Sequence, residues 1–117
     1  MKYTEKLQEL AAYVRRKEAG HGRPADASFE IRIYDKDPGY LRIELFEPFQ
    51  GRVMASTGTL VTVSPYPSKG AIFLKINISA TAIGSFTETQ GRLLGIVALY
   101  RIAGALHGRV KDQEFEA

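Results

Sequence analysis

Few residues in this chain of 117 have the types and spacing that acid–base or metal chemistry requires. The two histidines, His21 and His107, are far apart in the sequence, and the chain contains no cysteine to act as a nucleophile or a thiolate ligand. Asp35 and Asp37 could offer two oxygens to a divalent cation, but Ca²⁺ needs about six or more oxygen ligands and the loop ends in Pro-Gly. Turn-forming aspartates are the simpler interpretation. We therefore predict a non-enzymatic protein without a metal or cofactor site.

A stronger pattern brings aromatic and cationic side chains to one face of a predicted sheet. Alternation from residue 28 onward turns every second residue away from the apolar core face. The outward residues are Arg32, Tyr34, Tyr40, Arg42, Phe46, Phe73 and Lys75. Bases of single-stranded nucleic acid stack on aromatic rings while Arg and Lys neutralise phosphates, so this face predicts nucleic-acid binding. Glu30 and Glu44 share the face and would repel phosphates, which favours the alternative of a regulator or inhibitor that binds a protein.

A second basic cluster, formed by Arg15, Arg16 and Lys17, lies near the end of the first predicted helix. Residues 1–25 hold six Lys or Arg against three Glu, and the rest of the chain is balanced, so the whole net charge of +3 lies at the front. In one interpretation the cluster only complements the negative end of the helix dipole. In the other it extends the cationic sheet face and contributes to nucleic-acid binding.

Hydrophobic periodicity predicts a single domain with its elements in the order α-β-β-β-β-α. The expected elements are a helix over about 2–19, strands over about 28–35, 40–47, 52–64 and 71–79, a helix over about 88–109 and a frayed tail over 111–117. A kink is expected near Gly58, a hairpin tip at 65–70 and a capping box at Thr87–Gln90. These elements predict an α+β fold, a four-stranded antiparallel meander sheet with the N-terminal and C-terminal helices packed on one face.

The register of the first hairpin raises a question of charge. Pairing Ile33 with Leu41 keeps the apolar residues on one face, but it also sets Arg32 opposite Arg42. Like charges directly opposite each other are unfavourable. We therefore expect either an offset register that pairs arginine with glutamate diagonally, or an anion bound near the arginines.

The last predicted helix is apolar almost all the way round, although it carries Arg92 and Arg101. At about 100° per residue these arginines point in opposite directions, so neither marks an ordinary solvent-facing side. The apolar run is too short for a transmembrane helix, which needs about 20 residues. Such a helix needs cover on several sides, and we predict a homodimer whose interface contains Leu94, Ala98, Arg101 and Ala105.

Four glycines in the same helix indicate close packing, because each costs about 0.8–1 kcal/mol relative to alanine in a helix interior. Gly91 and Gly95 lie on one side of the helix, and Gly104 and Gly108 lie on nearly the opposite side. We expect one pair to contact the sheet and the other to contact a partner helix, unless Gly108 is a helix cap.

Composition is that of an ordinary globular protein, with 44% hydrophobic and 25% charged residues. The charged N-terminus lacks the apolar run of a secretory signal and cysteine is absent, so we predict a cytoplasmic protein. A third hypothesis is a small-ligand domain with a pocket between the sheet and the helices, lined by Arg101 or His107.

Overall fold

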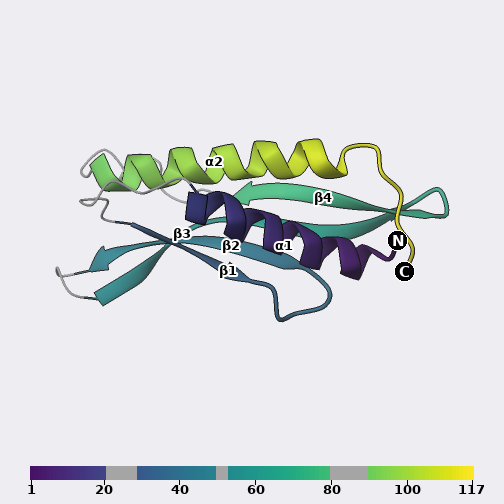
Figure 1. The fold of residues 1–117 in the computed structure, drawn as a ribbon, viewed down its shortest axis with the longest axis horizontal. Coiled ribbons are helices and arrows are strands. Elements are labelled where there is room, and N and C mark those ends of the chain that lie inside the picture. The colour runs from purple at the N-terminus through teal and green to yellow at the C-terminus, as the bar shows by residue number, and fades with distance from the viewer. Residues whose placement is uncertain (21–28, 50–52, 80–89) are drawn as a thin grey trace.

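The structure, a computed structural model, describes residues 1–20, 29–49, 53–79 and 90–117. Its elements are α1 (Tyr3–Gly20), β1 (Glu30–Tyr34), β2 (Leu41–Phe49), β3 (Val53–Ser68), β4 (Ala71–Ser79) and α2 (Gln90–Val110). The strands form one antiparallel sheet in the order β1-β2-β3-β4, and both helices lie on one face of it (Figure 1). The predicted α+β meander is confirmed. The predicted capping residues at 87–89 and the connector that contains His21 lie outside the described residues.

The hydrophobic core lies between the sheet and the helices. Leu7, Leu10 and Val14 recur at helical spacing on α1, and all three are buried. The apolar strand residues with no exposed area are Leu41, Ile43, Leu45, Val61 and Val63. Leu99 and Leu106 of α2 complete the contact from the second helix. Burying each such side chain contributes about 1.5–3 kcal/mol, which is the main stabilisation of the two-layer arrangement.

The first hairpin has a register two residues away from the simple one predicted from the apolar pattern. Ile33 pairs with Ile43 instead of Leu41, and Arg32 therefore faces Glu44 instead of Arg42. The pairing keeps the apolar residues on the core face, because a shift of two preserves the side-chain alternation. It also replaces the repulsive pair of Arg32 with Arg42 by the attractive pair of Arg32 with Glu44. These two residues lie directly opposite each other, whereas a diagonal pair was expected. The offset alternative is the one that the hairpin adopts.

The expected kink in β3 is present. The register shifts between Glu44 and Phe46, whose partners on β3 are Leu60 and Ser56, so Leu45 faces three residues of β3. Gly58 lies in the middle of the three with φ 80°, a conformation that residues with a side chain rarely adopt. The extra residues bend the strand at this point.

The second hairpin is longer than predicted. The expected tip at 65–70 is wrong, because β3 continues to Ser68 and only Lys69 and Gly70 form the turn. Both have positive φ, 52° and 81°, as a type I′ turn requires. Pro65 and Pro67 are tolerated within β3 because β2 ends its pairing at Val63, so no neighbouring strand needs their missing N–H groups.

The last residues pack back on the sheet, although the sequence predicted a frayed tail. Phe115 is buried, and its N–H donates to the carbonyl oxygen of Ile72 at 2.8 Å. Glu116 exchanges two backbone hydrogen bonds with the first residues of the chain: its N–H donates to Met1 and its carbonyl accepts from Tyr3. The two termini therefore lie side by side at one end of the molecule (Figure 1).

Candidate interaction surfaces

The aromatic rings on the outer face of the sheet are covered by the arginines of the same face. The Arg32 guanidinium lies 4.0 Å from the centre of the Phe46 ring, and the Arg42 guanidinium lies 4.2 Å from the centre of the Tyr34 ring. These are cation–π contacts, in which the flat guanidinium occupies the ring face on which a base would stack. Phe46 is also buried. The structure brings these four predicted residues together, but in contact with one another.

The same arginines have carboxylate partners. The Arg32 Nε lies 3.3 Å from Oε1 of Glu30, and the Arg42 Nε lies 3.8 Å from Oε1 of Glu44. The hydrogen bond that Arg32 donates to the Glu30 carboxylate raises the pKa of Arg32 above its ordinary value. Each of the two arginines thus has a glutamate of the same face beside it.

The other predicted residues of the outer face are more open. Phe73 stacks on Tyr66 with ring centres 5.6 Å apart, and these two residues are directly paired on β3 and β4. Lys75 is exposed two residues further along β4. Tyr40 precedes β2 and is exposed. Cross-strand aromatic packing of this kind stabilises a hairpin that extends beyond the rest of the sheet.

Arg15, one member of the basic cluster of α1, binds Asp35 in the loop after β1. Both of its terminal nitrogens donate to the carboxylate, at 2.7 and 2.9 Å. This bidentate hydrogen bond lowers the pKa of Asp35 and raises that of Arg15. Arg15 therefore joins α1 to the first hairpin and does not extend a cationic surface over the sheet.

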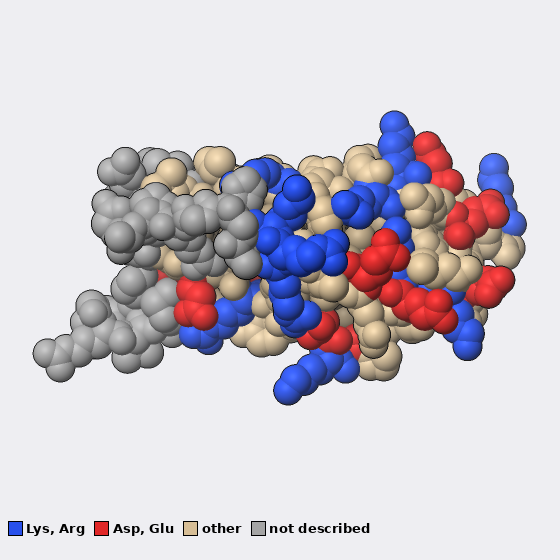
Figure 2. All heavy atoms as spheres, viewed as in Figure 1, with Lys and Arg blue, Asp and Glu red and all other residues tan. Residues whose placement is uncertain are grey.

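Lys17, another member of the basic cluster, lies with Arg109 of α2 around one aromatic ring on the helical face. The Arg109 guanidinium lies 3.5 Å from the centre of the Tyr13 ring, and the Lys17 ammonium lies 5.8 Å from it. Figure 2 shows Lys and Arg side chains concentrated over the middle of this face, with acidic side chains nearer the end that holds the termini. Within the described ranges, no carboxylate lies at ion-pair distance from Arg16, Lys17 or Arg109. We call Tyr13, Arg16, Lys17 and Arg109 the Tyr13 cluster.

The predicted dimer residues of α2 share one stripe, which lies at the boundary between the buried and the exposed side of the helix. Ala98 is buried in the core of its own chain, so it offers little surface to a partner. The reason is that α2 turns Ala98, Leu99 and Ile102 toward the sheet and α1. Leu94 and Arg101 are exposed, and Ala105 is half-buried.

An apolar stripe on α2 remains open to solvent. Leu94, Val97 and Tyr100 are 45%, 60% and 51% exposed, far more than the other large apolar residues that the structure describes in α2, and the exposed Arg101 lies between Leu94 and Val97 around the helix. Gly104 and Gly108 continue the stripe, and a Cβ added at either of them would meet nothing within 4 Å. Gly95, in contrast, faces the sheet, where an added Cβ would lie 2.5 Å from Cδ1 of Leu45. The prediction that one glycine side contacts the sheet is confirmed at Gly95.

The free edge of β4 runs beside α2. Because the Ile72 carbonyl accepts from the tail, the backbone of Ile72 points away from β3. Strand alternation then gives the same direction to the N–H and C=O groups of Leu74, Ile76 and Ile78. No described residue pairs with β4 on this side beyond Ile72.

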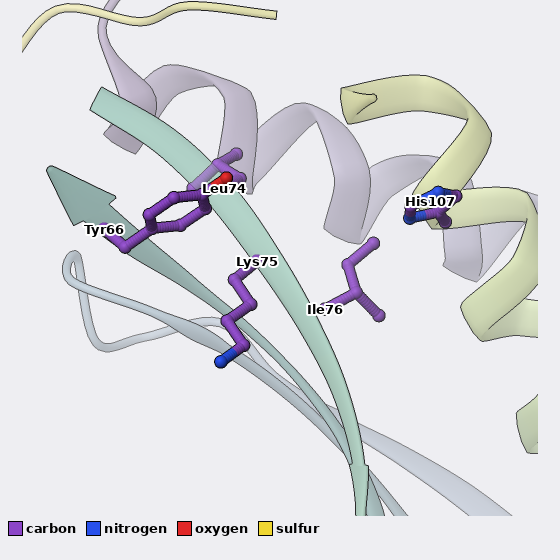
Figure 3. A pocket seen from close by; sticks show the side chains of 5 residues that line it. All are labelled: Tyr66, Leu74, Lys75, Ile76 and His107. Carbon is purple, nitrogen blue, oxygen red and sulfur yellow. The ribbon is translucent and has the colours of Figure 1, made fainter. Parts of the chain in front are cut away.

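A cavity of about 480 Å³ opens between this edge and α2. It is lined by Tyr66, Leu74, Lys75, Ile76 and His107. Figure 3 shows Ile76 and His107 pointing toward each other across the space between β4 and α2, while Lys75 points to the other side of the strand. Tyr100 lies two helical turns before His107 and so on the same side of α2. We call the edge backbone of residues 74–78 together with Tyr100 and His107 the β4 groove.

The sequence predicted a pocket between the sheet and the helices that His107 or Arg101 would line, and the structure places His107 there. Its neighbours in the cavity are apolar or aromatic apart from Lys75, whose side chain leaves on the other face. No group of three His, Asp or Glu residues in the described part of the chain is close enough to hold a metal ion. The groove offers backbone hydrogen bonds and apolar contact, which is what another polypeptide needs.

Comparison with protein-family models, with curated proteins and with solved structures finds no match to this chain. Among the described residues, no helix has the length and apolar character needed to cross a membrane.

Proposed function

We propose that this chain is a non-enzymatic protein-binding module that binds an extended polypeptide segment along the β4 groove. The observation that supports it is a strand edge that no described residue pairs beyond Ile72, directly beside a cavity whose lining mixes apolar and polar side chains. An added strand would receive backbone hydrogen bonds from Leu74, Ile76 and Ile78, as in recognition by β-augmentation. Every second side chain of that strand would enter the space between β4 and α2, where Tyr100 and His107 would contact it.

The outer sheet face supports this function better than nucleic-acid binding. Arg32 and Arg42 lie over the rings of Phe46 and Tyr34 and next to glutamates, so contacts within the chain compete with bases and phosphates for these groups. The balance of opposite charges on this face suits a protein surface.

A selection from displayed random peptides tests the proposal, because it samples many extended segments and requires no chosen partner sequence. The chain is immobilised sparsely, so that neighbouring copies cannot bind to each other and cover the β4 groove during selection. We expect enriched peptides with alternating apolar residues. Ile76→Pro, which removes an N–H that points to the free edge, should weaken their binding by about tenfold or more.

The matched control is Tyr40→Ser, which removes an exposed aromatic ring away from β4. It should leave peptide binding unchanged. If no peptides are enriched, or if they bind wild type and a folded Ile76→Pro variant equally well, the β4 groove is not a polypeptide site.

Nucleic-acid binding stays a second candidate because of the Tyr13 cluster on the helical face (Figure 2). Cations gathered around an aromatic ring can bind the phosphates of a single-stranded nucleic acid. A salt titration with single-stranded and double-stranded oligonucleotides tests it. If the cluster binds phosphates, the triple change of Arg16, Lys17 and Arg109 to Gln should flatten the salt dependence, since fewer counterions are released. An unchanged slope would remove the cluster as a nucleic-acid site.

A further inference from the structure

We infer that the strand bound in the β4 groove is β4 of a second copy of this chain, so that the two sheets join edge to edge. The inference rests on the proposed function, because both need an open β4 edge, and it names the partner. In the joined form, an eight-stranded sheet would carry both α2 helices side by side on one face. Two independent features of the chain support self-pairing, one on β4 and one on α2.

The first feature is the self-complementarity of the free edge. The C-terminal tail occupies Ile72, and β4 ends at Ser79, so the free stretch is residues 73–79. Its midpoint is Ile76. A twofold axis at Ile76 pairs the whole stretch with itself in antiparallel fashion, and it matches Leu74 with Ile78 of the second copy on the core face.

The same register also keeps the two copies of Lys75 from lying opposite each other. Lys75 is the single charged residue of β4. With the axis at Ile76, Lys75 faces Asn77 of the second copy. An axis at Lys75 itself would set two ammonium groups opposite each other, which is unfavourable. The sequence of β4 therefore favours one register over its neighbour.

The second feature is the open apolar stripe of α2. Tyr100 shares the side of His107, which faces the β4 edge, and Val97 and Gly104 lie next to that side. Edge-to-edge pairing of β4 brings a second α2 to this position, running antiparallel. The exposed Val97 and Tyr100 would then be covered, and Gly104, which has open space around it, lets the two helix backbones approach.

The absence of cysteine makes the register directly testable by disulfide formation. In the proposed register residues 75 and 77 form a non-hydrogen-bonded pair with Cα atoms about 4.5 Å apart, a separation that a disulfide spans. We expect an equimolar mixture of the single variants Lys75→Cys and Asn77→Cys to oxidise mainly to the mixed dimer. Both side chains are exposed on the outer face, so the substitutions leave the core intact. If disulfides between two copies of the same variant form as often as random pairing predicts, the proposed register is wrong.

Sedimentation equilibrium of the wild-type chain at micromolar concentrations tests the dimer itself. We expect a dimer, and Val97→Asp should weaken it by about 100-fold or more, because it buries an unpaired charge at the α2 contact. Tyr40→Asp, at an exposed aromatic residue outside β4 and α2, is the matched control and should leave the dissociation constant unchanged. Failure of the two proposals is distinguishable. A monomeric chain that still selects peptides at the β4 groove overturns the second-copy inference alone, whereas a monomer that selects none overturns both.

Discussion

The two edges of the sheet are built differently. β1 has five residues, and its outer-face charges, Arg32 and Glu30, pair with each other. The loop that follows it is bound to α1 through Asp35 and Arg15. β4 has nine residues with one charge, and a tail that covers only its first part. Short, charged edges resist association, whereas long apolar edges invite it.

The comparison separates a side of the sheet whose groups contact one another from a side with open groups. On the β1 side, side chains of the chain itself satisfy each other. On the β4 side, backbone groups and the apolar stripe of α2 remain available on adjacent surfaces. An edge that stays unpaired promotes aggregation, so the part of β4 that no described residue pairs is where we propose that a partner binds.

The largest expected effect concerns the tail that closes the beginning of the β4 edge. Phe115→Ala removes a side chain that is 8% exposed and packs in the core cluster. We expect the free energy of unfolding to fall by about 3 kcal/mol, as for other buried Phe to Ala changes, measured by urea denaturation. Gln113→Ala, at an exposed position of the same tail, is the control and should change it by less than about 0.5 kcal/mol. A similarly small loss for Phe115→Ala would mean that the tail does not close the edge.

The next test compares the two glycine sides of α2. Gly95→Ala places a methyl group against the buried Leu45, so it should destabilise the fold by about 1–3 kcal/mol. Gly104→Ala meets open space and gains helix propensity, so it should stabilise the monomer by up to about 1 kcal/mol. Thermal unfolding of dilute protein measures both. Equal effects of the two changes would contradict the difference between the covered and the open side.

The smallest effect is expected at the β1 side, from the ion pair of Arg15 with Asp35. The pair is partly exposed, with side chains 50% and 29% accessible, so we expect about 0.5 kcal/mol. The hydrogen bond from Arg15 lowers the pKa of Asp35 in the folded state. The stabilisation is therefore fully present above the unfolded pKa of about 3.9 and is lost as the pH falls through the lower folded value.

Asp35→Asn isolates this contribution. The difference in unfolding free energy between wild type and the variant should be present at neutral pH and shrink toward about pH 3. Asp37→Asn is a control in the same loop, where Asp37 accepts a hydrogen bond from the Gly39 N–H and an amide oxygen can replace it. A difference that stays constant with pH would show that the carboxylate charge is not involved.

Most of the fold follows from local patterns in the sequence. The alternation of Ile72, Leu74, Ile76 and Ile78 predicts β4 with its correct bounds, and the stripe on α1 predicts the first helix to within one residue at each end. Gly58 marks the kink in β3. These features depend on side-chain period and on backbone conformation, both of which a sequence records locally.

The candidate sites were harder to predict because they depend on contacts between distant segments. Arg15 and Asp35 belong to different elements, and only the packing of α1 on the sheet joins them. Periodicity gives the apolar positions of α2 but not which of them the chain itself covers, so Ala98 was assigned to an interface. The free backbone of β4 has no side-chain signature at all. Its position next to His107 follows from strand order and from the path of α2.

The pairing of Glu116 with Met1 and Tyr3 has a practical consequence for engineering. Because these backbones are hydrogen-bonded neighbours, a short linker could join them without disturbing the helices or the sheet. New ends opened in the exposed 36–38 loop would then give a circularly permuted protein, in which β2 is the first strand of the chain and β1 is the last. Any cargo fused to the original ends would leave from a single pole of the molecule, at the opposite end of α2 from its first turn (Figure 1).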